Sequence, residues 1–326
     1  MGKEHIYVYC SGILGAKTNI KNFKWIFGSI APEVSDEEYK KCALKFEISV
    51  KPEKDLIEPN VFTESFQSFL WEESSKTIFY RRTFPFGFNI GYNIKIDEDT
   101  VFVEMGSNYY KIIKNRFMNL HGSYYLLSDL ANMLLLKKGY LTLYASSVYF
   151  STLKRGLVCF AAPNTGKTLT ATTLCSEKKA FLIGEDVLIF NDGKVFSCPW
   201  TNSYRKNTVV DSVADLRKPE KNLKYEFKEY CDLTDVVVLS KGEKEINKSK
   251  EDVLKKMNIL NGYLFNYYSS PIVKTLGYFD EEYYKPWNNV SEKILEKMMN
   301  KKNCYIIKSE DSKSFAEIIY NEITGK

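Results

Sequence analysis

The chain has 326 residues, of which 44% are hydrophobic and 27% charged, a composition typical of a globular protein in water. Its net charge of +5 comes from 46 basic and 41 acidic residues, and so small and evenly spread an excess argues against a nucleic-acid-binding protein. The seven cysteines are scattered without a CxxC pair, which excludes a zinc knuckle or a disulfide framework as the basis of the fold.

The same sequence argues against a membrane or secreted protein. Its longest apolar stretch, residues 124–136, is interrupted by Ser128, Asp129 and Asn132 and falls short of the roughly 20 residues of a membrane span. The first residues, MGKEHIYVYCSG, lack the apolar core and the cleavage site of a signal peptide. We therefore expect a cytoplasmic protein without a membrane span. The length suits two domains, which we place at residues 1–120 and 121–326.

The first 117 or so residues contain short apolar runs bounded by Gly, Pro, Asp and Asn, as in a β-rich domain. The expected strands are residues 5–10, 43–50, 77–82, 88–96, 101–105 and 109–114. Within residues 88–96 a strict period of two places five apolar side chains on one face: Phe88, Ile90, Tyr92, Ile94 and Ile96. No catalytic motif occurs here. We expect a small antiparallel sheet that packs on the next domain, and its role in binding a partner stays open.

A helix is expected over residues 123–136, because its apolar residues have helical spacing and Lys137-Lys138-Gly139 ends it. A strand at residues 140–150 follows, and only five residues separate it from the next strand, residues 156–161. Five residues are too few for the crossover that parallel neighbours need. If adjacent, these two strands therefore form an antiparallel hairpin, unlike the parallel strands of common nucleotide kinases and GTPases.

The second of these strands leads into the sequence AAPNTGKT, residues 161–168, and then into a helix-prone segment, residues 169–177. Strand, tight loop and helix start form a phosphate-binding site, because the N–H groups of the loop and of the first helical turn point at one anion. The expected nucleotide-binding residues are Ala162, Pro163, Asn164, Thr165, Gly166, Lys167, Thr168 and Leu169. Lys167 would contact the β and γ phosphates, and the Thr168 hydroxyl would bind Mg²⁺. The alternative is a chance match before an ordinary helix, since Ala161 replaces the first Gly of the usual pattern.

Two adjacent carboxylates, Glu185 and Asp186, follow an apolar strand at residues 180–183. They come 18 and 19 residues after Lys167, at the end of a strand, where a phosphoryl-transfer site needs a metal ligand and a proton acceptor. The alternative is that these acidic residues only solvate a turn. Because a phosphate loop precedes them, we favour a functional role.

Beyond the carboxylates, Asn191-Asp192-Gly193-Lys194 is a hairpin turn between strands at 187–190 and 195–198. Arg205 is a candidate for offsetting charge on the transferred group. The mixed-charge run at 241–256 is expected to be a solvated loop and helix face. The remaining expected elements are strands at 235–240 and 304–308 and helices at 251–263, 290–299 and 312–323.

The order of these elements resembles the catalytic domain of HPr kinase/phosphorylase and the related serine kinases, which have the phosphoenolpyruvate carboxykinase type of phosphate loop. The order is a hairpin, AAPNTGKT, a helix, strand-GED-strand, a hairpin turn and Pro-Trp-x₃-Tyr-Arg. The resemblance covers residues 140–205 well and the remainder only in its pattern of elements. It implies an α+β or α/β fold in which an ATP-binding domain with a mixed sheet follows the N-terminal β-rich domain.

In that family, one of two acidic residues acts as base toward the acceptor hydroxyl and the other binds Mg²⁺, and these positions fall on Glu185 and Asp186. The resemblance thus makes Thr168, Asp186 and Glu185 candidate metal ligands. Two positions depart from the family: Glu185 replaces an aspartate, and Tyr144 occupies the place of a frequent His. The departures argue against phosphorylase activity. A signature segment of HPr kinase proper is missing, which argues against HPr itself as substrate.

These observations predict an ATP-dependent kinase that uses Mg²⁺ and phosphorylates a hydroxyl, either a serine of a peptide or protein or a small molecule. The candidate catalytic residues are Glu185, Asp186, Lys167 and Arg205. Two other classes stay open: a non-catalytic protein whose binding of a partner is switched by nucleotide, and an NTPase coupled to assembly. The acceptor and the oligomeric state, a homo-oligomer included, are not fixed by the sequence.

Overall fold

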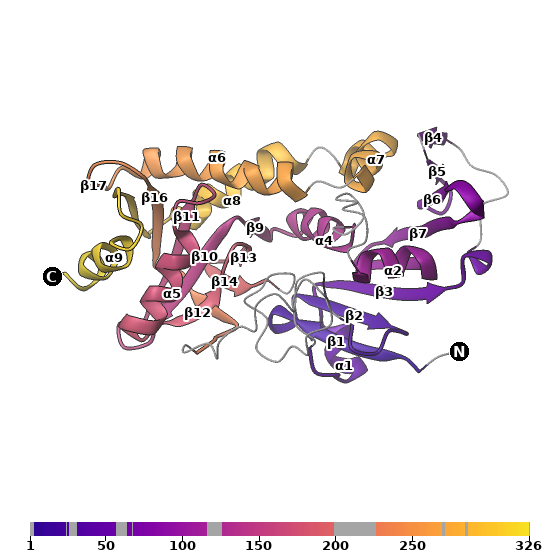
Figure 1. Cartoon of the computed structure of the whole chain (residues 1–326), viewed down its shortest axis with the longest axis horizontal. Helices are drawn as coiled ribbons and strands as arrows, with labels where there is room; N and C mark the ends of the chain where they lie inside the picture. The colour runs from indigo at the N-terminus through magenta and orange to yellow at the C-terminus, as the bar shows by residue number, and fades with distance from the viewer. Residues whose placement is uncertain are drawn as a thin grey trace. The chain divides into compact units, whose positions relative to one another are not determined.

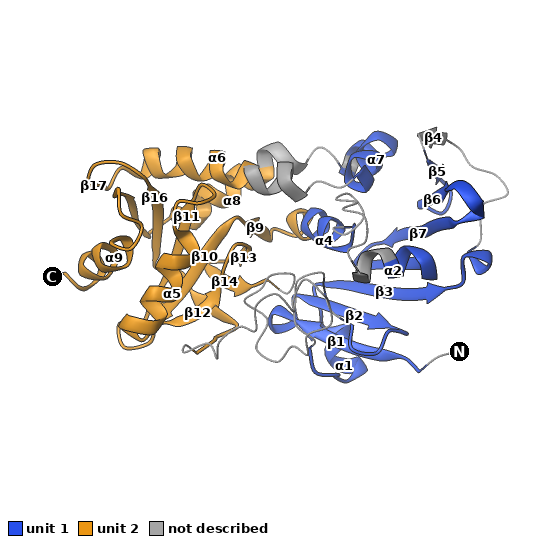
Figure 2. Cartoon of the chain, in the orientation of Figure 1, with its two compact units in different colours: residues 1–26, 30–134, 269–285 blue, residues 27–29, 135–268, 286–326 orange. Residues whose placement is uncertain are grey.

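The computed structural model describes residues 3–23, 25, 31–56, 64–66, 68–115, 126–198, 226–268, 271–283 and 286–325 (Figure 1). The chain forms two compact units (Figure 2). Unit 1 comprises residues 1–26, 30–134 and 269–285, and unit 2 comprises residues 27–29, 135–268 and 286–326. Compactness does not show that a unit folds alone, so the domains at 1–120 and 121–326 stay a prediction. Among the described residues, no helix is long and apolar enough to span a membrane.

The described strands of unit 1 form one eight-stranded sheet in the order β1-β2-β3-β8-β7-β6-β5-β4. The strands are β1 (His5–Tyr9), β2 (Leu14–Thr18), β3 (Leu44–Lys51), β4 (Glu64–Phe66), β5 (Phe69–Glu72), β6 (Thr77–Thr83), β7 (Asn89–Asp97) and β8 (Thr100–Gly106). The β2–β3 and β3–β8 pairs are parallel. The expected small antiparallel sheet is therefore wrong, because long connections let β3 run parallel to both neighbours, and short apolar runs carry no sign of this.

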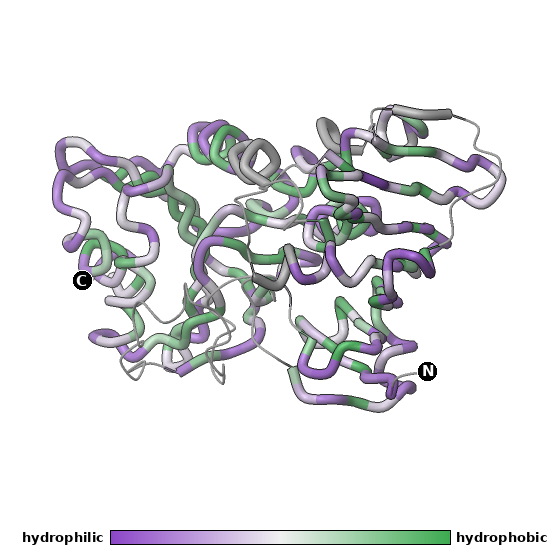
Figure 3. Tube along the Cα trace, turned by 45° about the vertical axis from the view of Figure 1, so that its right-hand side comes forward, coloured by the Kyte–Doolittle hydropathy of each residue, from purple (hydrophilic) through white to green (hydrophobic). Residues whose placement is uncertain are grey.

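Strand β7 has the predicted period of two. The side chains of Ile90, Tyr92, Ile94 and Ile96 are buried, with exposed fractions of 2%, 4%, 1% and 8%. Figure 3 shows hydrophobic and hydrophilic residues alternating along the strands of this unit. Phe88, in contrast, precedes the strand and is 43% exposed, so the buried pattern begins at Ile90, two residues later than predicted.

The predicted strand at residues 109–114 is wrong, because these residues lie in helix α2 (Ser107–Asn115). Tyr109, Ile112 and Ile113 have the spacing of three and four residues that suits a helix. Glu53, in the 3-10 helix η2 (Glu53–Asp55), accepts hydrogen bonds from the backbone N–H of Asn108 and the hydroxyl of Ser107. A carboxylate distant in sequence thus satisfies donors of the first turn, and local sequence cannot reveal it.

The other described helices of unit 1 are short. Helix α1 (Asp36–Lys40) starts with a capping box, in which Ser35 and Glu38 exchange hydrogen bonds. Helix α7 (Pro271–Phe279) places Phe279 against Trp71, with the rings stacked at a centroid distance of 5.6 Å. Helix α4 (Leu126–Lys137) begins in unit 1, and its last residues, from Leu135, belong to unit 2. It confirms the predicted helix over its described residues, and Gly139 follows with a φ of 81°.

Unit 2 contains two sheets among its described residues. The central sheet has the order β12-β10-β11-β16-β18-β17, and the side sheet has the order β15-β14-β13-β9. The strands are β9 (Leu141–Leu143), β10 (Ala145–Phe150), β11 (Arg155–Ala161), β12 (Phe181–Gly184), β13 (Leu188–Asn191), β14 (Lys194–Ser197), β15 (Tyr230–Asp232), β16 (Asp235–Ser240), β17 (Glu245–Asn247) and β18 (Asn303–Lys308).

The predicted hairpin is confirmed: β10 pairs with β11 antiparallel, from Ala145 opposite Phe160 to Phe150 opposite Arg155. On its other side β11 pairs with β16 parallel, and β16 with β18 parallel, so the central sheet is mixed. The turn between β13 and β14 is also confirmed, and its central residues Asp192 and Gly193 both have positive φ, as a two-residue hairpin turn requires. These pairings establish a mixed α+β architecture.

Helices cover both faces of the central sheet. One core contains side chains of α5 (Lys167–Lys178) and α9 (Phe315–Thr324), among them Leu174 and Phe315. The other contains side chains of α6 (Lys250–Tyr268), α8 (Pro286–Met299) and the side sheet, among them Met257 and Met298. Successive residues of β16 point to opposite faces of the sheet. Val236 and Val238 lie in the core with α6 and α8, and Val237 lies in the core with α5 and α9.

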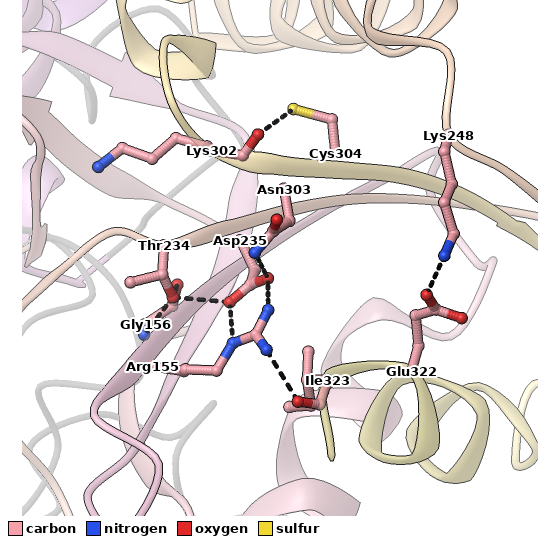
Figure 4. Close-up of polar contacts among 10 residues, drawn as sticks. All are labelled: Arg155, Gly156, Thr234, Asp235, Lys248, Lys302, Asn303, Cys304, Glu322 and Ile323. Atoms are coloured by element: carbon pink, nitrogen blue, oxygen red, sulfur yellow. Dashed lines mark hydrogen bonds and ion pairs between the residues drawn. The ribbon is translucent and has the colours of Figure 1, made fainter. Parts of the chain in front are cut away.

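The starts of three parallel strands meet at one buried carboxylate (Figure 4). Asp235, with no exposed surface, accepts hydrogen bonds from the Nε of Arg155 at 2.8 Å and from its Nη2. It also accepts from the Thr234 hydroxyl at 2.6 Å and from the Asn303 amide at 3.0 Å. Arg155 donates in addition to the carbonyl of Ile323 at 2.8 Å. One carboxylate therefore joins β11, β16, β18 and α9.

We expect Asp235→Ala to lower the free energy of unfolding by about 3–5 kcal/mol, because removing one partner of a buried ion pair leaves the other charge uncompensated. Urea denaturation followed by circular dichroism measures the change. Lys248→Ala is the control: it breaks an ion pair of the same helix α9, with Glu322, but the Lys248 side chain is 63% exposed, so its loss should matter little. An equally small effect in both variants would contradict the role given to Asp235.

Candidate functional site

The expected strand, loop and helix of a phosphate-binding site are present. Strand β11 ends at Ala161, residues 162–166 form the loop that the sequence predicts to bind phosphate, which we call the phosphate loop, and α5 begins at Lys167. Asn164 and Gly166 have positive φ values of 62° and 114°, so the loop turns sharply before the helix. The hydroxyl of Ser312 donates a hydrogen bond of 2.8 Å to the carbonyl of Thr165, which fixes the loop from outside.

The exposure of the predicted nucleotide-binding residues follows this geometry. Ala162, Pro163 and Asn164 are exposed at the tip of the loop, and Thr168 and Leu169 are exposed on the first turn of α5. The backbone N–H groups of the first turn have no partner within a helix, so they are available to an anion beyond the helix end. The exposed residues therefore surround a position at which phosphate groups can bind.

Lys167 is the exception, because its side chain is only 6% exposed. The amine lies 3.4 Å from Oδ1 of Asp186 and 3.4 Å from the ring centroid of Tyr144, so it is held by one ion pair and one cation–π contact. It is buried and makes no hydrogen bond to any described residue. Burial lowers the pKa of Lys167, and the charges of Asp186 and Glu185 partly offset this effect.

A buried ammonium without hydrogen bonds is costly, and an anion that brings oxygen acceptors removes the cost. Lys167 is the first residue of α5, and the N–H groups of the first helical turn point out of the same helix end. The residues at this position therefore fit the phosphate groups of a nucleotide, and this fit rests on the amine of Lys167 itself.

The side chains opposite Lys167 lie where the chain passes from one sheet to the other. The predicted strand at 140–150 divides into β9 of the side sheet and β10 of the central sheet, with Tyr144 between them. In the same way Glu185 and Asp186 lie between β12 and β13. Asp186 has a φ of 66°, and the carbonyl of Glu185 accepts from the N–H of Val187 at 2.8 Å, so the chain turns tightly.

Both carboxylates are accessible to a ligand. The Asp186 side chain is 47% exposed, and Glu185 is partly exposed. Because Asp186 contacts the amine of Lys167, it lies on the side of the site that would face phosphate groups. Arg205, the remaining predicted catalytic residue, lies outside the described residues.

The donor set suits Mg²⁺ rather than a metal bound by protein groups alone. Within the described ranges, no three or more His, Cys, Asp or Glu side chains are grouped as a metal site, and the seven cysteines are buried thiols outside any disulfide. Mg²⁺ in phosphoryl-transfer proteins is bound through one or two carboxylates together with substrate phosphates. Thr168, Asp186 and Glu185 offer such oxygen ligands.

Sequence reasoning missed two serines that contact the loop and the helix. Ser312 bonds Thr165, and the Ser146 hydroxyl lies 3.5 Å from the carbonyl of Lys167. Ser312 follows the predicted strand at 304–308. Because parallel strands end at the same edge of a sheet, its position after that strand could have predicted that it lies near the loop. Ser146 lies in the middle of a strand and gives no such signal.

Comparisons with known proteins add little to this geometry. No family model matches the chain, and no curated protein matches it. Among solved structures, the chain is similar to the HPr(Ser) kinase/phosphatase from Coxiella burnetii over 44% of its own length and 98% of that chain, with 15% sequence identity and a TM-score of 0.22. This is a distant similarity, so the activity has to be inferred from the residues of the site.

We expect Gly166→Ala to abolish binding of inorganic tripolyphosphate. An added Cβ would lie 2.7 Å from the Cβ of Ser312, and the φ of 114° disfavours any side chain, so the loop must shift. Gly193→Ala is the control, because Gly193 has a φ of 75° but nothing within 4 Å of an added Cβ. Calorimetric titration should show binding to Gly193→Ala and none to Gly166→Ala; equal binding would contradict the packing of Ser312 against the loop.

Proposed function

We propose that this protein is an ATP-dependent kinase that transfers a phosphoryl group to a hydroxyl, a serine of a peptide or protein. The observation that carries the proposal is the buried amine of Lys167 at a helix start that follows the loop. Among the described residues this amine contacts only the Asp186 carboxylate, as an ion pair at 3.4 Å, and the ring of Tyr144. Two accessible carboxylates next to that amine supply the other groups that phosphoryl transfer needs.

Binding of the nucleotide follows from the loop and the helix. Backbone N–H groups of Asn164, Gly166, Lys167 and Thr168 would donate to the phosphates. The Lys167 amine would exchange its contacts with Tyr144 and Asp186 for phosphate oxygens. Thr168 and Asp186 would hold Mg²⁺, which when bound offsets charge on the phosphate oxygens. In this class of reaction, catalysis is mostly positioning and neutralisation of charge.

Glu185 is assigned to the acceptor. The acceptor oxygen forms a bond to the γ-phosphorus, the bond from that phosphorus to the bridging oxygen breaks, and ADP leaves with the electron pair. The hydroxyl proton passes to the Glu185 carboxylate. We assign this role to Glu185 because it is partly exposed, whereas Asp186 forms an ion pair with the Lys167 amine. Arg205 is proposed to offset charge on the transferred group.

The roles of the two carboxylates should separate under mutation. Glu185→Gln should leave ATP affinity nearly unchanged and slow transfer by about 10²–10⁴-fold, as expected for loss of a general base. Asp186→Asn keeps a residue that tolerates positive φ and should weaken the Mg²⁺-dependent part of ATP binding. Lys167→Ala should lose about 1.5–3 kcal/mol of binding free energy.

Calorimetry with and without Mg²⁺ measures binding, and mass spectrometry of serine-containing peptides incubated with ATP measures transfer. If ATP binds and neither carboxylate variant changes transfer or hydrolysis, the protein is instead a nucleotide-switched binding protein. If ATP is hydrolysed at the same rate with and without peptides and no peptide gains a phosphoryl group, it is an NTPase.

ATP binding should take up protons at alkaline pH. The pKa of Lys167 in the free protein is lowered from its ordinary 10.5, and phosphates beside the amine would raise it. A group whose pKa rises on binding takes up a proton between its two pKa values, so affinity should fall as pH rises through that interval. Calorimetry in two buffers of different ionisation enthalpy measures this uptake. The heat of ATP binding should differ between the buffers for the wild type and not for Lys167→Met. Identical heats of binding to the wild type in both buffers would contradict the prediction.

A further inference from the structure

Unit 1 contains a pocket of about 400 Å³ that the proposed chemistry does not use. It lies where β6 ends and β7 begins, and residues of η2 and of the first turn of α2 also line it. Its charged lining residues are Glu53, Lys54, Arg81 and Arg82. We call it the basic pocket. Its volume is in the range of small-ligand sites, about 300–1,000 Å³.

Two of the charged side chains are fixed in place. Arg81 lies against Gly91, where an added Cβ would meet its Cδ at 2.7 Å, and its guanidinium donates to the carbonyls of Tyr80 and Tyr92 at 2.7 and 3.2 Å. Glu53 lies against Gly106 in the same way, at 2.7 Å. Because both positions are glycines, the Arg81 and Glu53 side chains can pack directly against the backbone there, and these contacts hold them in the lining of the pocket.

The pocket presents positive charge. The Glu53 carboxylate already accepts from the N–H of Asn108 and the hydroxyl of Ser107, so it serves the start of α2. Lys54 and Arg82 are exposed, and neither has an ion-pair partner among the described residues. Arg81 also donates to the Asn93 side chain at 2.9 Å, so Lys54 and Arg82 are the cations exposed to a ligand. Three positive charges stand against the single negative charge of Glu53 in the lining, which favours an anionic ligand.

An exposed aromatic loop borders this pocket. The 3-10 helix η3 (Pro85–Gly87) connects β6 to β7, and its Phe86 has a fully exposed side chain and a φ of 67°, unusual for an aromatic residue. Phe88 is 43% exposed, and the Arg82 guanidinium lies 4.9 Å from the ring centroid of Phe84. An exposed Phe in a strained conformation contributes nothing to the core, and such side chains typically contact a partner.

We propose that the basic pocket and the loop around Phe86 bind an acidic segment of a polypeptide that carries apolar side chains beside its carboxylates. A small anion would use the cations and leave Phe86 in water, whereas a peptide can engage both. The inference rests on the proposed function in one respect: the polypeptide is the substrate that receives the phosphoryl group. Docking on unit 1 would raise its local concentration at the site.

The test uses the full chain and a fluorescein-labelled peptide of repeated Asp-Glu-Leu, with repeated Asn-Gln-Leu as its uncharged match. Fluorescence anisotropy should show binding of the acidic peptide only. The double variant Lys54→Gln/Arg82→Gln and the single variant Phe86→Ser should each weaken it about tenfold or more. The control double variant Lys95→Gln/Lys111→Gln removes the same charge from exposed positions outside the pocket and should retain binding.

Three outcomes would overturn the proposal. The control variant could lose as much affinity for the acidic peptide as the pocket variants, the uncharged peptide could bind equally well, or inorganic phosphate at millimolar concentration could displace the acidic peptide. ATP binding is measured in the same variants. Lys167→Ala should retain peptide binding, and the pocket variants should retain ATP binding, so the two sites fail separately. If the peptide binds but serine-containing acidic peptides gain no phosphoryl group, docking stands and the kinase assignment fails.

Discussion

The buried carboxylate of Asp235 is the constraint on which the geometry of unit 2 depends. It ties the starts of β11, β16 and β18 together and, through Arg155, the end of α9. Because the starts are fixed, the register places Ala161 beside Leu239 and Leu239 beside Ile307 at the other end. The loops that follow β11 and β18 then emerge at one edge, where Ser312 can reach Thr165. The ion pair between Asp235 and Arg155 at one end of the sheet therefore helps to position the phosphate loop at the other end.

At that edge the ammonium group of Lys167 is buried, which costs free energy. The amine of Lys167 is buried and makes no hydrogen bond to the described residues, with only the ring of Tyr144 and the carboxylate of Asp186 against it. An anion at the start of α5 would offer oxygen acceptors to this amine. The binding energy of an anion thus includes the removal of a cost that the fold already carries.

The sequence predicted features that depend on neighbouring residues. A five-residue link specified the β10–β11 hairpin, and Asp192-Gly193 specified the next turn. It could not show that the strand at 140–150 would divide at Tyr144, since that division depends on which sheet each half joins. Nor could it show that residues 109–114 are helical, because Glu53, more than fifty positions away, completes the helix start. Lys167, Glu185 and Asp186 were predictable as a group, whereas the cation–π contact and Ser312 required the fold.

The backbone at Asp186 also limits how this site can change over evolutionary time. A φ of 66° is tolerated chiefly by Gly, Asn and Asp, and of these only Asp carries a charge. Aspartate and asparagine codons differ by a single base. A lineage could therefore lose the charge in one step and keep a residue that suits this backbone conformation. The turn between β12 and β13 would then be retained after the carboxylate charge is lost.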